Sequence, residues 1–199
     1  KYLDFNIAYY IKNIWSVTEI YKKTPFIVYT DSSSNVPLYN EINIVFTSET
    51  EFVITLEKSN ITLFNVHRQF PVVSLDMPDL NIKGKVFQPV RNKYINLTVL
   101  PNSSIPLTRF IGKKLMFRFF DDKSLISQFR SVSVQEKKSS SILLLSMNGT
   151  CVPKICNFLN SLTNVYLDKS VERKNQVAEN TIQFIESQFF LSKVCFFLS

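Results

Sequence analysis

The sequence predicts a mainly β protein, an antiparallel β-sandwich of jelly-roll type followed by one C-terminal amphipathic α-helix. Two observations predict this class. Apolar and polar side chains alternate with a period of two through the first three quarters of the chain, which is the period of a strand. The pattern changes after about Pro153, and from Ser170 to Lys193 the apolar spacing is helical. We therefore expect a β-sandwich domain over residues 1–150, and a cysteine-containing segment with a helix packed on it over residues 151–199.

The alternation predicts strands over these ranges, in order: 3–11, 14–20, 26–30, 42–47, 51–57, 60–67, 70–75, 83–88, 93–100, 114–120, 126–135 and 141–147. Four of them have a clear apolar face: Ile42/Ile44/Phe46, Phe52/Ile54/Leu56, Ile95/Leu97/Val99 and Leu115/Phe117/Phe119. The chain has 18 Phe and 8 Tyr, which favour half-buried sheet surfaces. Between strands we expect exposed loops at Ser32–Asn35 and Ser139–Ser141, and a strand-ending turn at Asp121–Ser124.

A helix is expected over residues 170–193, with Asp168 or Ser170 as its N-cap. Its apolar residues form one stripe, with spacings of seven, four, three and four: Val171, Ala178, Ile182, Ile185 and Phe189. Such a helix packs on the sandwich or joins a second copy or a partner. The apolar tail 194–198 is expected to pack on the body or across an interface, so a homo-oligomer formed through the helix and tail is one possibility.

Composition excludes several classes of function. The net charge is +7, but Lys and Arg are spread as pairs and do not form a basic block, so a nucleic-acid partner is disfavoured. Three glycines are too few for a phosphate-cradling or dinucleotide-binding loop, and no cofactor is expected. No run of 18 apolar residues occurs, so no membrane span is predicted.

No catalytic residue and no metal ligand is assigned from the sequence. The single histidine, His67, ends a predicted strand and is expected to be structural. A serine-nucleophile elbow of the form G-x-S-x-G is absent. The adjacent pair Asp121-Asp122 is interpreted as part of a turn, because neighbouring strand residues point to opposite faces and cannot share a cation.

Glycosylation is expected at Asn60, Asn102 and Asn148, whose N-x-[ST] motifs fall in predicted turns, whereas Asn96 lies in mid-strand and is a poorer candidate. Cys151 and Cys156 bracket four residues and are expected to form a disulfide in a secreted protein, leaving Cys195 over. Two alternatives stay open. Cys151 could pair with Cys195 and staple the helix to the sandwich, or all three could be free thiols in the cytosol.

Four stretches resemble a known family: Ile42–Leu56, Tyr94–Val99, Phe119–Val134 and Ile142–Cys151. The first looks like the family's paired early strands, and the last like its closing strand, which ends in Cys. Residues 41–150 thereby resemble the farnesoic acid O-methyltransferase-like domain of arthropod proteins. The resemblance implies a lectin-type β-sandwich used for binding, with no functional residue carried over.

These observations together favour a secreted, non-enzymatic binding module for a glycan or a protein ligand. A self-assembling structural protein, such as a viral coat or envelope subunit, is the alternative, because jelly rolls serve that role. An enzyme whose site forms only in the fold, with His67 as its base, is a second alternative.

Overall fold

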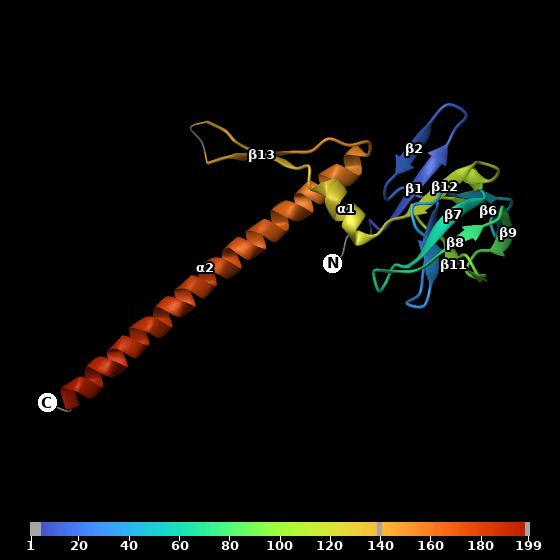
Figure 1. Cartoon of the computed structure of the whole chain (residues 1–199). Coiled ribbons are helices and arrows are strands. Elements are labelled where there is room, and N and C mark those ends of the chain that lie inside the picture. The colour runs from blue at the N-terminus through green and yellow to red at the C-terminus, as the bar shows by residue number, and fades with distance from the viewer. Residues whose placement is uncertain (1–4, 139–140, 198–199) are drawn as a thin grey trace. The chain divides into compact units, whose positions relative to one another are not determined.

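The computed structural model of this chain describes residues 5–138 and 141–197, with side chains described as far as residue 190 in the C-terminal helix. The chain divides into two units, Lys1–Cys151 and Val152–Ser199, which we call the β domain and the helical segment and treat separately (Figure 1). The described part is mainly β, with antiparallel sheets and one long C-terminal helix. The predicted fold class is confirmed at that level.

The β domain contains a six-stranded sheet, two three-stranded sheets and a two-stranded ribbon within its described residues. In spatial order the large sheet is β2 (Val17–Ile20), β1 (Ile7–Lys12), β12 (Leu115–Phe119), β5 (Ile42–Phe46), β6 (Glu51–Leu56) and β9 (Leu80–Lys85). One small sheet is β10 (Pro89–Arg91), β11 (Asn96–Pro101) and β3 (Phe26–Tyr29). The other is β4 (Asn35–Pro37), β7 (Ser59–Asn65) and β8 (Phe70–Met77), and β13 (Ser133–Glu136) pairs with β14 (Leu143–Ser146). A short 3₁₀ turn, η1, covers Leu107–Phe110.

One hydrophobic core receives side chains from the six-stranded sheet and from both three-stranded sheets. The four apolar faces predicted from the alternation are all buried, which confirms them. Aromatic rings tie the sheets together: the Phe26 ring of β3 lies 5.5 Å from that of Phe46 and 6.0 Å from that of Phe117, centroid to centroid, in tilted and edge-on arrangements. This core fixes the strand ends from which the loops of the candidate site project.

Two predictions in the β domain are wrong. The segment expected as a strand over 126–135 begins in helix α1 (Asp122–Phe129), and only β13 is extended. The expected turn at Asp121–Ser124 is the start of this helix, because the Asp121 side chain accepts a hydrogen bond from the Ser124 N–H and caps it. The loop expected at Ser32–Asn35 is a turn except at its last residue, because Asn35 begins β4, whose Val36 is buried.

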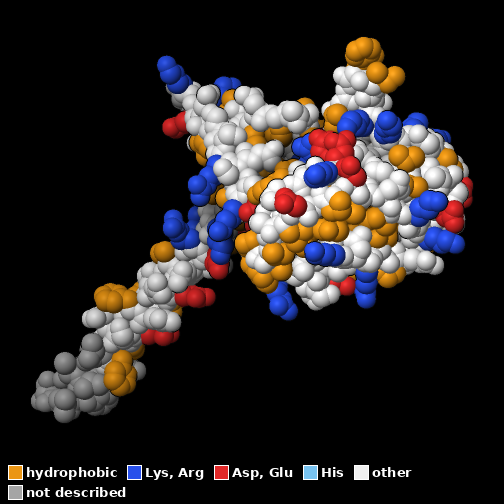
Figure 2. All heavy atoms as spheres, turned by 45° about the vertical axis from the view of Figure 1, so that its right-hand side comes forward, with side chains coloured by type: hydrophobic (Ala, Val, Ile, Leu, Met, Phe, Trp, Pro, Cys, Tyr) orange, Lys and Arg blue, Asp and Glu red, His pale blue; other side chains and the backbone are white. Residues whose placement is uncertain are grey.

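The helical segment is a single helix, α2 (Val152–Phe197), which begins far earlier than the predicted residue 170. Pro153 is tolerated there because the first turn of a helix has no use for its missing N–H. From Leu162 to Phe190 every residue except Ser170 is exposed, apolar ones included. Apolar side chains lie at the surface along this helix among charged ones (Figure 2).

Several expectations stay predictions. Packing of the helix on the sandwich is one of them, since the two units are described separately. The loop at Ser139–Ser141 falls mostly outside the described residues, as do the side chains of the tail 194–198 and of Cys195. Among the described residues, no helix combines the length and apolarity that crossing a bilayer requires.

Candidate functional site

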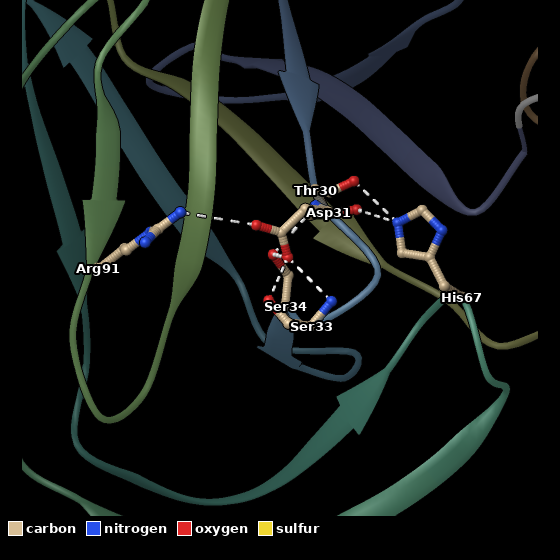
Figure 3. Close-up of polar contacts among 6 residues, drawn as sticks. All are labelled: Thr30, Asp31, Ser33, Ser34, His67 and Arg91. Carbon is tan, nitrogen blue, oxygen red and sulfur yellow. Dashed lines mark hydrogen bonds and ion pairs between the residues drawn. The ribbon is translucent and has the colours of Figure 1, made fainter.

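The turn between β3 and β4 is organised around one carboxylate. The Oδ1 atom of Asp31 accepts hydrogen bonds from the Ser33 N–H (2.9 Å), the Ser33 hydroxyl (2.7 Å) and the Ser34 hydroxyl (2.9 Å) (Figure 3). Its Oδ2 atom lies 3.8 Å from Nη2 of Arg91, at the end of β10. The hydrogen bonds from Ser33 and Ser34 lower the pKa of Asp31, because they favour its charged form. Asp31 is therefore a fixed, ionised acceptor at the surface.

His67 ties a second loop to this turn. Its Nε2 atom lies 2.8 Å from the Thr30 carbonyl oxygen and 3.4 Å from the Thr30 hydroxyl (Figure 3). A carbonyl oxygen can only accept, so Nε2 is the donor in this contact. With its proton already on Nε2, the ring cannot take one from the Thr30 hydroxyl at that atom. The arrangement thus holds two loops together and does not form a nucleophile–base pair.

The ring of Tyr29 stands between two hollows in this part of the β domain. It is 57% exposed, on the outward face of edge strand β3. The larger hollow has a volume of about 750 Å³ and is lined by residues of four segments, including Asn6, His67, Gln69 and Asp122. The smaller, of about 180 Å³, includes Asp31, Ser34, Arg91 and Asn96. An exposed aromatic face is therefore flanked on both sides by polar groups.

The smaller hollow also contains an unsatisfied acceptor. The side-chain oxygen of Asn96, the first residue of β11, is buried and has no hydrogen-bond partner among the described residues. A buried acceptor without a partner costs free energy. Because this oxygen has almost no accessible surface, it is not offered to a ligand in the hollow. Arg91 on the same wall supplies donors, and Asp31 supplies an acceptor. The hollow therefore offers a ligand both hydrogen-bond donors and hydrogen-bond acceptors.

The wall of the larger hollow is held by the start of α1. Gln69 Oε1 accepts from the Asp122 N–H at 3.0 Å, and Asn6 Nδ2 donates to Asp122 Oδ1 at 2.7 Å. The Tyr39 hydroxyl donates to Asp121 Oδ1 at 2.5 Å. Burial by itself would raise the pKa of Asp121, but the hydrogen bonds from Ser124 and Tyr39 more than offset it and lower that pKa. The polar side chains of this wall are thus fixed in place before any ligand arrives.

A third hollow of about 690 Å³ lies over β6, β9 and β10. Its charged residues include Glu51 and Lys85, which form an ion pair at 3.4 Å. Gly84 forms part of its lining, where the ring of buried Phe52 leaves no room for a side chain. Glu51 and Lys85 already contact each other, and the lining residues Phe52 and Val90 belong to the core, so this hollow is a weaker candidate site.

Metal ligands do not gather in the part of the chain that the structure describes. No group of three His, Cys, Asp or Glu side chains lies close enough there to hold an ion. The carboxylates nearest the candidate site, Asp31, Asp121 and Asp122, each accept hydrogen bonds from the protein. These hydrogen bonds orient the carboxylates toward protein donors.

The predicted glycosylation sites do not line either of the two hollows beside Tyr29. Asn60 is exposed but lies inside β7, not in a turn, and its amide donates to Asp76 Oδ1 at 3.1 Å. Asn102 is half-buried in the loop after β11, where its amide donates to the Thr24 carbonyl at 2.8 Å and its oxygen accepts from the Ser104 N–H at 3.0 Å. Asn148 is exposed after β14. All three stay predictions, and Asn148 has the most accessible setting.

Cys151 and Cys156 are both free in the structure, the first buried and the second exposed. Cys156 lies in the second turn of α2 and Cys151 directly precedes the helix. The disulfide between them stays a prediction.

The sequence assigned no binding role to the candidate site residues, and it considered His67 only as a structural residue or as the base of an enzyme. Tyr29 and Asp31 are close in sequence, but Gln69 and Arg91 lie in two other segments, and only the fold brings the three segments together. One local signal was available: Asp31 followed by Ser33 and Ser34 is typical of a turn in which an Asp side chain binds the backbone two residues on. That pattern predicts the turn but not the neighbouring ring of Tyr29.

Comparison with protein-family models, with curated proteins and with solved structures gives no significant match to this chain. The resemblance of residues 41–150 to the farnesoic acid O-methyltransferase-like domain therefore stays a prediction.

Proposed function

We propose that the β domain is a non-enzymatic binding module whose ligand is a glycan held against Tyr29. The observation that carries this proposal is the exposed Tyr29 ring between two hollows, one lined by both apolar and polar side chains and the other mainly by polar ones. A sugar ring has an apolar face and a rim of hydroxyl groups. The apolar face of the sugar fits against an aromatic ring, and its hydroxyl groups pair with donors and acceptors placed around that ring.

The polar groups around Tyr29 are arranged to recognise hydroxyls. Asp31 accepts hydrogen bonds, and Arg91 donates them. Asp31 is held by Ser33 and Ser34 before binding, so little conformational entropy is lost when a ligand arrives. This preorganisation supports recognition of a neutral, hydroxyl-rich ligand.

The binding interpretation is favoured over catalysis by the geometry at His67. Its Nε2 proton points to the Thr30 carbonyl, and both carboxylate oxygens of Asp31 contact Ser33, Ser34 or Arg91. General-base catalysis needs an acceptor nitrogen directed at the proton to be removed. A protein ligand is the other form of this function, and loops on a rigid β scaffold also suit it.

The finer features of the predicted fold and compartment belong to the same proposal. A jelly-roll sandwich is supported by the single core to which the six-stranded and both three-stranded sheets contribute. A secreted glycoprotein is supported by the exposure of Asn60 and Asn148. A lectin-type module of the farnesoic acid O-methyltransferase-like kind would account for the sandwich fold, the secretion and the resemblance of residues 41–150.

The test is binding of the full chain to a panel of immobilised neutral oligosaccharides. Tyr29→Ala should abolish the signal on whichever glycan binds, because it removes the apolar platform. Tyr166→Ala is the matched control, since Tyr166 is 63% exposed and lies on α2. Absence of any glycan signal overturns the glycan ligand. Binding that survives Tyr29→Ala overturns the site.

The alternative of a self-assembling protein is favoured by a separate observation, the apolar stripe exposed along α2. It concerns the helical segment and does not compete with the Tyr29 site.

A further inference from the structure

The apolar stripe of α2 follows the seven-residue repeat of a coiled coil. In a heptad labelled a to g, Asn175, Ile182 and Phe189 take the a positions, and Val171, Ala178 and Ile185 take the d positions. Ile182 is 55% exposed and Ile185 is 59% exposed. This seam runs over residues 171–189, about 28 Å of helix. A repeat of a and d positions on one face is typical of helices that pair.

Asn175 is the informative exception in the seam. It is polar, yet it occupies an a position between the apolar d residues Val171 and Ala178. In two-stranded parallel coiled coils, a single Asn at a faces the same Asn of the second chain. That pairing fixes register and chain number at some cost in stability. On a helix that packed against a different surface, an Asn here would have no such partner.

The charges beside the seam distinguish the two possible orientations of a second helix. All three e positions are glutamates, Glu172, Glu179 and Glu186. The g positions from Lys174 onward are Lys174, Thr181 and Gln188. Antiparallel pairing would set the e row against the e row, glutamate facing glutamate. Parallel pairing sets each g residue against the e residue of the next heptad, so Lys174 faces Glu179 of the second chain, twice by symmetry.

We propose that two copies of this chain associate through α2 as a parallel, in-register coiled coil over residues 171–189. Three observations select this occupant of the seam: its heptad spacing, Asn175 at an a position, and the Lys174–Glu179 complementarity that only the parallel arrangement provides. The proposal does not depend on the Tyr29 site.

The first experiment measures the mass of the full chain by size-exclusion chromatography with light scattering at several protein concentrations. The expected result is twice the chain mass of 23.1 kDa. Ile182→Asp with Ile185→Asp should give the monomer, because both charges enter the seam. Val177→Asp with Phe184→Asp is the matched control at c positions and should stay dimeric. Near-UV circular dichroism of each variant checks that the β domain remains folded. A wild-type monomer or trimer overturns the proposal.

A charge series tests orientation. In the parallel dimer, Lys174→Glu should raise the dissociation constant about tenfold, since two attractive pairs become two repulsive ones. Glu179→Lys should do the same, and the double exchange should restore the wild-type value. In an antiparallel dimer, Glu179→Lys would instead strengthen association by relieving the facing glutamates. That outcome overturns the parallel assignment.

Register is tested by cross-linking. In a chain whose three cysteines are replaced by serine, Ala178→Cys should form an intermolecular disulfide on mild oxidation, because equal d positions face each other only in register. Val177→Cys, at a c position, is the control and should stay reduced. Failure of Ala178→Cys to cross-link in a chain that is dimeric by mass overturns the in-register arrangement. Association with only a different protein would leave both cysteine variants monomeric and overturn the proposal as a whole.

Discussion

Gly84 offers a sharp test of how tightly the β domain is packed. It lies in β9 directly opposite Phe52 of β6, whose ring is buried. A Cβ atom at residue 84 would lie 2.5 Å from Cζ and 2.6 Å from Cε2 of that ring, and 3.0 Å from a methyl of Val90. The Phe52 ring cannot swing aside freely, because it packs edge-on against Phe46 with centroids 5.9 Å apart. Gly84→Ala must therefore force the core apart.

The magnitude follows from two opposing effects. Overpacking a core by one methyl group costs about 1–3 kcal/mol. Replacing Gly by Ala also restricts the unfolded chain, which returns about 0.4–1 kcal/mol. We expect Gly84→Ala to lower the free energy of unfolding by about 1–2 kcal/mol in total. The assay is urea unfolding followed by near-UV circular dichroism, which reports on the packed aromatic rings of the β domain and is little affected by the helix.

A double-mutant cycle identifies the cause. Phe52→Leu shortens the side chain that the new methyl meets, so Gly84→Ala should cost little in that background. The coupling between the two sites should reach about 1 kcal/mol. If Gly84→Ala costs the same with Phe52 and with Leu at position 52, or costs nothing in the wild type, then the close approach does not limit the packing and the reasoning fails.

Three further predictions concern the site and the helix. Ser33→Ala should raise the pKa of Asp31 toward its ordinary value, as measured by NMR titration. Because the pKa of Asp31 is lowered in the folded protein, the ionised carboxylate stabilises the fold above about pH 4. That stabilisation is lost as the pH falls through the lowered pKa. An unchanged titration would contradict the assigned hydrogen bonds. Asp121→Ala removes the cap of α1 and should cost about 1 kcal/mol in urea unfolding, against no change for exposed Lys123→Ala. Asn175→Val should raise the thermal stability of the associated helix while allowing larger oligomers, seen as a mixture of masses by light scattering.

The sequence predicted the buried faces well because burial on one face of a strand demands strict alternation. Ile42, Ile44 and Phe46 show this, and all three are buried. It failed at α1, since Leu125 and Phe129 are four residues apart, a spacing that suits a helix and a strand equally. Residues Asp121 to Ser124 likewise suit a turn and a helix cap. The outcome there depends on whether the cap and the buried Leu125 outweigh strand pairing, which the local sequence does not reveal.

The candidate site could not be predicted for a different reason. Tyr29, His67 and Arg91 belong to loops and strand ends whose proximity depends on how three sheets share one core. No local pattern encodes such proximity. The start of α2 was missed because the helix was placed only over the apolar stripe that begins at Val171, although the four-three-four spacing of Ile155, Leu159, Leu162 and Tyr166 also fits a helix.

The two proposals together make one more prediction, because a parallel dimer carries two Tyr29 sites on one assembly. A shallow, open site binds a single sugar weakly, and linking two such sites turns the second binding event into an intramolecular one. The gain reaches about 10²–10⁴ in apparent affinity where both sites can engage. Wild type and the Ile182→Asp, Ile185→Asp variant should therefore bind the soluble glycan identified by the panel equally. On a surface densely coated with that glycan, the wild type should dissociate far more slowly. Equal dissociation on the dense surface would show that the two sites cannot engage together, even if the dimer and the site both exist.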